Sequence, residues 1–466
     1  MKNKPDPKYK WRAMLVVSIG IFMATLDASI INIALPTLTR YFNTDIPTIE
    51  WVILSYLVTI TTLLLTLGRL SDMYGRKPVF CLGLLIFTLG SGLCSLSASA
   101  TQLIAFRVVQ GLGAAMVMAN GPAIITDVFP HTERGKAMGL IGAVVSIGSM
   151  AGPALGGFLI HWMGWQSIFY INIPLGLLGT VYAFRTLKRD QPHDGQKFDI
   201  PGAVFMFMSL ISLLLVITRG QELGWDSPAI IGLSVMFAVF LTGFIIAEKR
   251  ADQPMVELSL FRNRPFSASN TSGFLSFVAM FAAFFLMPFY MEEILGYNTV
   301  HMAMALIAVP LVMALVAPVS GWISDRTNSF KLSSLGMAVT CLALIFLGNL
   351  DQNATFLDIV FMLGMIGLGM GMFQSPNNSI VMGSVPKNRL GIAGGMLGMV
   401  RNLGMVTGIA ISGAVFTRGL QSNQAAGLAY EAAFLGGFHD AFMVAAVICA
   451  VGIITSLMRG KVRDKQ

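Results

Sequence analysis

The chain has 466 residues, of which 55% are hydrophobic and only 12% are charged, and its mean hydropathy is +0.72. A soluble domain has about 25% charged residues, so this composition excludes an ordinary soluble enzyme. The formal charge of +8 at neutral pH would also fit a nucleic-acid binder, so the basic residues must be located before the charge is interpreted.

Apolar runs of about 20 residues, the length at which a helix spans a bilayer, recur along the whole chain. The sequence therefore predicts an all-α integral membrane protein with fourteen spanning helices. The predicted spans are 12–36, 50–69, 79–97, 102–124, 136–160, 168–187, 200–217, 228–247, 265–290, 301–323, 331–349, 355–377, 392–417 and 438–458. The first run is too long for a signal-peptide core, so we expect it to be a span.

Most of the 31 Lys and Arg residues lie in alternate connections, beginning with the segment before the first span. Because cytoplasmic loops carry an excess of these residues, we expect both termini in the cytoplasm. The outer loops hold only Arg40, Arg219 and Arg418. The net charge is thus a topology signal and not a nucleic-acid footprint, and the short connections favour a bacterial cytoplasmic membrane.

The first span contains the sequence LDASIINIALP, in which Asp27 lies roughly 15 Å below the outer surface. An ionisable residue inside a span is rare and is a functional candidate for that reason. Asn32 follows in the same span. It is a candidate for a substrate pocket, because hydrocarbon leaves an amide without hydrogen-bond partners.

The connection after the second span reads G-x3-D-x2-G-R-K and comprises Gly68, Asp72, Gly75, Arg76 and Lys77. The glycines permit a tight turn at the membrane surface, and the charged side chains can exchange partners with neighbouring helix ends. The loop is therefore a candidate for conformational gating. The alternative is a basic anchor on the cytoplasmic side, which requires neither the aspartate nor the glycine spacing.

The fourth span contains RVVQGLGAA, which places Arg107 and Gln110 one turn apart on one helix face. An arginine at the centre of a span costs about 2.5–3.5 kcal/mol on insertion scales, so it needs an acidic partner or a water-filled cavity. Arg107 and Asp27 lie at depths that differ by about 7 Å, so we expect a direct or water-bridged contact. Burial favours the neutral acid, whereas a guanidinium favours the carboxylate. The pair is a candidate titrating site, with stapling of two helices as the alternative.

The fifth span carries the pattern G-x8-G-x3-G-P-x2-G-G. Its members are Gly139, Gly148, Gly152, Pro153, Gly156 and Gly157. Glycines at helical spacing let another helix approach closely, and a proline inside a span weakens the hydrogen-bond ladder and permits bending. The pattern predicts a role in conformational change, with simple helix packing as the alternative.

A weak internal repeat relates the two parts of the chain. GRLSDMYGRK after the second span is echoed by GWISDRTNSFK after the tenth, so that Gly68 and Asp72 correspond to Gly321 and Asp325. We therefore expect an N-terminal six-helix bundle over 1–187, two inserted helices with linkers over 188–264, and a C-terminal six-helix bundle over 265–466. Repeated halves around a central site are typical of secondary transporters.

The ninth span is rich in phenylalanine, and the chain has 30 methionines. Aromatic and thioether side chains suit a pocket that repacks around varied apolar molecules. The candidate pocket residues are Asn32, Gln110, Asn270, Phe277, Phe281, Gln374, Asn377, Arg401 and Asn402. Helix packing and interhelical hydrogen bonding are the simpler explanations for each of them. Arg401 could bind an anionic group or extend toward a water-filled cavity.

The four cysteines lie in apolar stretches, and the five histidines lack metal-ligand spacing. The chain has no GxxxxGK[ST] nucleotide-binding run, and its spans hold no clustered nucleophiles or paired carboxylates. We therefore expect no metal, nucleotide or other cofactor and no enzymatic activity. The expected partners are a small-molecule substrate, protons and the lipid bilayer, without nucleic acid, and we expect a monomer.

The G-x3-D-x2-G-R-K loop, the R-x2-Q-G-x-G of the fourth span and the G-P-x2-G-G of the fifth resemble the signature motifs of the major facilitator superfamily. Fourteen spans with LDASIINIALP, WVILSYLV and IFYINIPLG resemble its 14-span drug:proton antiporter branch. The resemblance implies a major facilitator fold and alternating access, with substrate expelled in exchange for inward protons. It implies proton coupling by Asp27 and Arg107, cytoplasmic closure by the loop, and antiport and bending by Gly152 and Pro153.

The chain also departs from this branch. Relatives often have Trp-Arg-Trp before the sixth span, where this chain has Trp165, Gln166 and Ser167. Acids are scarce in the spans of the C-terminal half, so we expect lipophilic drugs that are neutral or monocationic rather than dicationic. The alternatives are a proton-coupled exporter of an endogenous lipid, siderophore, peptide or metabolite, and a proton-coupled importer, against which the span 5 motif argues.

Overall fold

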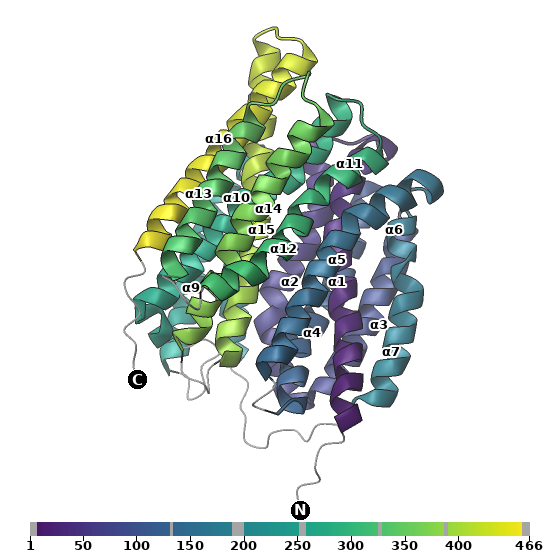
Figure 1. Cartoon of the computed structure of the whole chain (residues 1–466), viewed down its shortest axis with the longest axis vertical. Helices are drawn as coiled ribbons and strands as arrows, with labels where there is room; N and C mark the ends of the chain where they lie inside the picture. Colours follow the sequence, from purple (N-terminus) through teal and green to yellow (C-terminus); the bar gives the residue numbers. More distant parts are fainter. Residues whose placement is uncertain are drawn as a thin grey trace, which may run out of the picture.

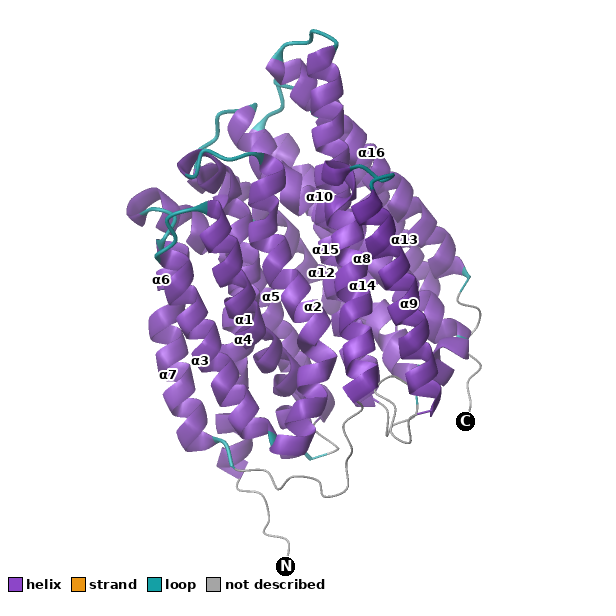
Figure 2. Cartoon of the chain, turned by 180° about the vertical axis from the view of Figure 1, so that it is seen from behind, coloured by secondary structure: helices purple, strands orange, loops and turns teal. Residues whose placement is uncertain are grey.

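The computed structural model describes residues 7–130, 134–188, 200–250, 258–324, 329–385 and 390–458. Within these residues the chain is helical with short connections and no strands, as predicted (Figures 1 and 2). The helices are α1 (Pro7–Tyr41), α2 (Ile46–Tyr74), α3 (Arg76–Ser95), α4 (Ala100–Val128), α5 (Arg134–Met163), α6 (Ser167–Tyr170), α7 (Asn172–Thr186), α8 (Ile200–Leu223), α9 (Pro228–Arg250), η2 (Leu258–Arg262), α10 (Arg264–Glu293), α11 (Thr299–Leu306), α12 (Ala308–Ser324), α13 (Ser329–Gly348), α14 (Phe356–Gly383), α15 (Leu390–Ala425) and α16 (Tyr430–Leu457).

Thirteen helical segments of the described chain are long and apolar enough to cross a membrane. The remaining long helix, α5, has 30 residues and packs along α1, which completes the fourteen predicted spans. The helices extend past the predicted apolar runs. For example, α1 covers Pro7–Tyr41, whereas hydropathy predicts only 12–36. Hydropathy detects the part that matches the hydrocarbon core, and the helix continues into the polar interface.

Two spans are interrupted, which the sequence analysis did not predict. The sixth span is divided into α6 and α7 at Ile171, and the tenth into α11 and α12 at Ile307. In each case a proline, Pro174 or Pro310, follows three residues after the break. Proline cannot donate a backbone hydrogen bond to the preceding turn, so the ladder is interrupted in both spans. The breaks are not related by the repeat, because the counterparts α16 and α2 are continuous helices.

Glycine-mediated helix crossings recur in the two halves. A Cβ atom added to Gly113 of α4 would lie 2.6 Å from the carbonyl oxygen of Gly83 in α3. The equivalent Cβ on Gly369 of α14 would lie 2.5 Å from the carbonyl oxygen of Gly336 in α13. Only glycine permits backbones to approach this closely. The repeat therefore extends from the loop motif into the packing of the helices.

The contact between the first and fifth helices of each half repeats in the same way. Gly148 of α5 packs against the backbone of Phe22 in α1, and Gly404 of α15 packs against the backbone of Phe274 in α10. The two halves are therefore built on one helix arrangement, with α10 to α16 in the places of α1 to α7 (Figure 1).

The inserted helices α8 and α9 form a hairpin at the side of the molecule (Figure 2). Helix α8 contacts both α2 and α15, and the guanidinium of Arg219 lies 4.7 Å from the ring centre of Trp51 in α2. In the apolar 18-residue stretch of α9, only 11% of the residues are buried. A helix that is apolar on all sides and barely buried is suited to contact lipid, so α8 lies against both halves while α9 faces outward.

Helix α1 begins and α16 ends at one end of the bundle, here termed the terminal end (Figure 1). At the opposite end the two halves meet in a contact that we term the opposite-end seal. Its members are Arg40, Glu50, Gly157, Glu292, Thr299 and Gly413. Toward the terminal end, α12 diverges from α5, so the contact between α5 and the tenth span is concentrated on α11 (Figure 1).

Two glycines at equivalent places of α5 and α15 allow this seal to close. A Cβ on Gly157 would lie 2.6 Å from the carbonyl oxygen of Thr299, whose hydroxyl donates to the Gly157 carbonyl oxygen at 3.4 Å. A Cβ on Gly413 would lie 3.0 Å from the carboxyl carbon of Glu50. An ion pair between Arg40 and Glu292 joins α1 to α10 beside them.

Candidate functional site

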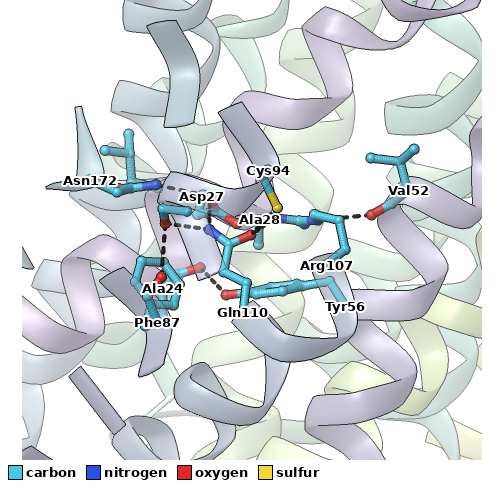
Figure 3. A network of polar contacts seen from close by, with 12 residues as sticks. Ala24, Asp27, Ala28, Val52, Tyr56, Phe87, Cys94, Arg107, Gln110 and Asn172 are labelled. Carbon is cyan, nitrogen blue, oxygen red and sulfur yellow. Dashed lines mark hydrogen bonds and ion pairs between the residues drawn. The ribbon is translucent and has the colours of Figure 1, made fainter. Parts of the chain in front are cut away.

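Asp27 lies inside the N-terminal half, in a network of polar side chains from α1, α3, α4 and α7 (Figure 3). We term this network the Asp27 cluster. Its members are Asp27, Ser91, Arg107, Gln110 and Asn172, and each of them is 0% exposed. Charged and amide groups are rarely buried this completely unless they bond to one another.

The cluster confirms the expected contact between the first and fourth spans. Arg107 donates from Nη1 to Oδ2 of Asp27 in a direct ion pair. Its Nε donates to the carbonyl oxygen of Val52 in α2 at 2.9 Å, and its Nη1 also donates to Oε1 of Gln110 at 2.7 Å. The guanidinium carbon of Arg107 lies 4.1 Å from the ring centre of Tyr56, so the ring covers one face of the guanidinium in a cation–π contact.

The second carboxylate oxygen of Asp27 accepts two further hydrogen bonds. Gln110 donates from Nε2 at 2.8 Å, and Asn172 donates from Nδ2 at 2.9 Å. The same Nε2 of Gln110 donates to the hydroxyl oxygen of Ser91 at 2.7 Å. Three donors therefore surround one buried carboxylate, an arrangement that stabilises its charged form through charge-assisted hydrogen bonds.

Asn172 is a site residue that the sequence analysis missed. It is the first residue of α7, directly after the break at Ile171, and the close packing of α3 against α7 carries it into the cluster. The signal was present in the INIP sequence. Pro174 has no backbone N–H, so it interrupts the hydrogen-bond ladder of the helix next to the amide of Asn172. An asparagine near a predicted span boundary reads as an interfacial residue, and only the helix break reveals its depth.

Replacing Asn172 by alanine is expected to lower the free energy of unfolding by about 2 kcal/mol, the typical contribution of a hydrogen bond to a charged group. Thermal unfolding of the purified variant and of the wild-type protein checks this. Asn349 is exposed directly after α13, and its side chain donates only to the carbonyl oxygen of Ile345, so Asn349→Ala is the matched control. Equal stability of the two variants would contradict the assignment.

The described residues of the C-terminal half hold no equivalent of this cluster. The repeated glycine contacts place Ala279 of α10 at the position of Asp27, and Leu363 and Ile366 of α14 at those of Arg107 and Gln110. All three apolar residues are buried. The crossing of α10 and α14 therefore forms around apolar residues. Holding the matching helices α1 and α4 together does not by itself require a buried ion pair.

The predicted gating loop joins α2 to α3 through Gly75, whose φ of +98° is a backbone conformation that suits glycine. Arg76 donates from Nη1 to Oδ2 of Asp127 at 2.5 Å and to the carbonyl oxygen of Ala123 at 3.3 Å. The ammonium of Lys77 lies 5.1 Å from the ring centre of Phe184. The loop thus contacts the ends of α4 and α7, and Asp127 is a partner that the sequence analysis missed.

The remaining loop residues are less informative. Gly68 lies in α2 with only Ala119 near its Cβ position, and it makes no close backbone contact. The side chain of Asp72 and the whole of Asp325 lie outside the described part of the chain.

The glycines of the span 5 motif face two different helices. Gly148, Gly152 and Gly156 pack against α1, where they meet Thr25, Ser29 and Ile30. Ser29 donates its hydroxyl to the Gly148 carbonyl oxygen at 3.2 Å. Gly157 instead faces α11 across the seal, and Pro153 lies inside α5. The motif therefore combines packing within a half with contact between halves.

The candidate pocket residues do not form one group. Gln110 was predicted for the pocket, but it is bonded inside the Asp27 cluster, because its amide completes the coordination of the buried carboxylate. Asn32 and Asn270 each donate to a carbonyl oxygen of their own helix. Gln374 is partly exposed on α14, and Phe281 packs beside Phe284 of its own helix.

The other four candidates lie on three packed helices of the C-terminal half, α10, α14 and α15. Phe277 of α10 packs on Gly404 of α15, next to Arg401 and Asn402 in the sequence. One turn along α10, Gly273 lies near both Asn377 of α14 and Val400 of α15. Within the described residues Oδ1 of Asn377 and Nδ2 of Asn402 are buried without a hydrogen-bond partner.

The ion pair between Arg40 and Glu292 gives the seal a modest electrostatic contribution, because the Arg40 side chain is 62% exposed. Replacing Arg40 by glutamate should place two acids together and lower the transport rate about fivefold, which corresponds to about 1 kcal/mol. The double exchange of Arg40→Glu with Glu292→Arg should restore the rate. Uptake and efflux assays at low and high salt check this, and failure of the exchanged pair to recover would contradict a direct pairing.

Two repeated helical halves, joined at one end and enclosing a buried ion pair in one half only, define a secondary transporter of the membrane rather than an enzyme. The chain belongs to the Major Facilitator Superfamily, since the sequence model of that family matches residues 17–409. This confirms the family that the loop, span 4 and span 5 motifs predicted.

The chain is similar to several named transporters. It is 33% identical over 459 residues to the riboflavin transporter RibZ of Clostridioides difficile (strain 630), covering 98% of this chain and 99% of that protein. It is 30% identical to the multidrug transporter protein MdtP of Bacillus subtilis (strain 168), covering 89% of this chain and 77% of that protein. It is also 30% identical to the multidrug resistance protein Stp of Mycobacterium tuberculosis (strain CDC 1551 / Oshkosh), covering 88% and 76%.

Solved structures share the fold at low sequence identity. A bacterial homolog of the human lysosomal transporter Spinster, in an inward-facing and unoccupied conformation, superposes with a TM-score of 0.72 at 15% identity, covering 97% of this chain and 98% of that chain. The POT family transporter PepTSo gives a TM-score of 0.72 at 14% identity, covering 98% and 100%.

Proposed function

We propose that this protein is a proton-coupled antiporter that exports small lipophilic molecules across a bacterial cytoplasmic membrane, with both termini in the cytoplasm. The observation that carries the proposal is the buried Asp27 cluster, which the fold does not require and which the C-terminal half lacks. A buried, exchangeable carboxylate is the usual means of coupling proton movement to a conformational change in membrane proteins.

In this proposal the terminal end is the cytoplasmic side, and the structure represents the state that is closed to the outside by the opposite-end seal. Asp27 is ionised while Arg107 pairs with it. Opening of the seal moves α1 relative to α4, separates the pair and lets Asp27 take a proton from the outside. Return to the closed state delivers that proton inward, and no nucleotide, metal or other cofactor takes part.

The energetics are sufficient for export. One proton that enters down about 150 mV releases roughly 3.5 kcal/mol. At 1.4 kcal/mol per tenfold change, this sustains roughly a 300-fold gradient of a neutral substrate. Exchange of one proton for one monocation would be electroneutral and would use the pH gradient alone.

Two classes of substrate are supported by different observations. Relatives named as multidrug transporters and the scarcity of acids in the C-terminal spans support lipophilic drugs, neutral or monocationic. One relative, which matches over 99% of its own length, is named as a riboflavin transporter, which supports a metabolite as the alternative. The chain is proposed to act as a monomer in either case.

The deciding experiment uses purified protein in liposomes that contain a pH-sensitive dye. A proton gradient is imposed, and lipophilic cations, neutral drugs and riboflavin are added in turn. Antiport predicts proton release that depends on substrate and stops when the gradient is collapsed. Substrate movement that is insensitive to the gradient would contradict proton coupling, and a response to riboflavin alone would select the metabolite.

A further inference from the structure

Arg401 is the second arginine inside a predicted span, and its surroundings differ from those of Arg107. It lies in the middle of α15, about 17 Å along the helix from Leu390. Its side chain is partly exposed, and it forms no hydrogen bond or ion pair with any described residue. Arg107, by contrast, is fully buried among partners.

The neighbouring glycines define the direction in which Arg401 points. Gly398, three residues before it, faces Leu64 of α2, and Gly404, three residues after it, packs on Phe277 of α10. Successive helical residues are separated by 100°, so Arg401 lies midway between these two faces. Helix α2 belongs to the N-terminal half and α10 to the C-terminal half. Arg401 therefore faces the boundary between the halves, where alternating access requires a substrate to pass.

The nearby side chains are aromatic and amide groups rather than acids. Phe277 lies beside the neighbouring Gly404, and Asn402 follows Arg401 with an unpartnered, 3% exposed amide. No ion pair joins Arg401 to an acidic side chain among the described residues. An arginine in a span is costly unless it has a partner, and the described protein supplies none.

We propose that Arg401 is the anion-binding residue of the substrate site, and that the preferred substrates are aromatic molecules carrying an oxyanion group. Guanidinium binds carboxylate, sulfonate and phosphate oxygens through two parallel hydrogen bonds, and it selects against cations by repulsion. The proposal rests on the proposed transport function and narrows it, since it disfavours the monocationic substrates. Arg401 lies too deep for the headgroup of a bilayer lipid to supply the oxyanion.

The test is direct binding to the purified protein, followed by fluorescence anisotropy. The probes share an aromatic ring and differ only in charge: naphthalene and pyrene with a sulfonate, a neutral sulfonamide or a trimethylammonium group. We expect the wild-type protein to bind at least one sulfonate about tenfold or more tightly than its neutral and cationic counterparts. Arg401→Gln should reduce this preference to less than about twofold, and Arg401→Lys should retain part of it.

Arg418→Gln is the matched control, because Arg418 lies on the same helix but is exposed at the opposite end. Its preference should equal that of the wild-type protein. Absence of a sulfonate preference in the wild-type protein, or its survival in Arg401→Gln, would overturn the inference. Because binding is measured without a proton gradient, failure of the antiport proposal would leave this result intact. Likewise, proton flux driven only by neutral or cationic probes would support antiport while refuting the role of Arg401.

Discussion

Replacing Asp27 by asparagine is expected to reduce substrate-driven proton flux by at least about 100-fold. Asparagine occupies the same volume but cannot carry a proton between the two sides. Its NH2 group also replaces one of the two carboxylate oxygens, so a donor faces either Arg107 or the pair Gln110 and Asn172, which are themselves donors. The measurement is dye-detected proton movement in liposomes at several substrate concentrations, because loss of coupling must persist at saturating substrate.

Loss of folding would also abolish flux, so the stability of the variant must be measured separately. Breaking a buried ion pair from one side costs about 3–5 kcal/mol, because Arg107 is left as an uncompensated charge. The double variant Asp27→Asn with Arg107→Gln removes that charge and should recover much of the thermal stability. It should remain uncoupled. Recovery of flux in the double variant, or normal flux in Asp27→Asn, would place proton coupling elsewhere.

Much of this site could be predicted from sequence because its charged members break an otherwise apolar pattern. Asp27 and Arg107 lie in different spans, and the rise of a helix was enough to bring them to similar depths. The structure confirms this contact. Asn172 could not be found in this way, because its depth depends on a helix break that hydropathy does not detect.

The place of Gln110 in the cluster could not be predicted for a related reason. Its polarity and depth in span 4 are compatible with either a pocket or a buried network, and only the packing of α3 and α7 decides between them. The opposite-end seal could not be predicted at all. Contacts such as Gly413 with Glu50 join helices from different halves, and no local pattern specifies how the two halves meet.

The second large effect is expected at Gly157, which forms the seal rather than the proton site. Replacing Gly157 by valine should prevent closure of the opposite end and reduce transport by at least about tenfold. Its Cβ would already lie 2.6 Å from both the Thr299 carbonyl oxygen and the Ala303 side chain, and the backbone of α11 cannot yield as a flexible side chain would. The chain should therefore collect in states open at that end.

The closure itself can be measured with cysteines at Arg40 and Glu292, which are in contact in the sealed state. Cross-linking by a bifunctional thiol reagent with a spacer as long as the Arg–Glu pair should be efficient in the otherwise unchanged protein and at least about fivefold less efficient with Gly157→Val. Gly394→Val is the matched control, since a Cβ on Gly394 meets nothing within 4 Å. If Gly157→Val cross-links as well as this control, the seal does not depend on the close approach of α5 to α11. The span 5 motif would then act through its packing on α1 alone.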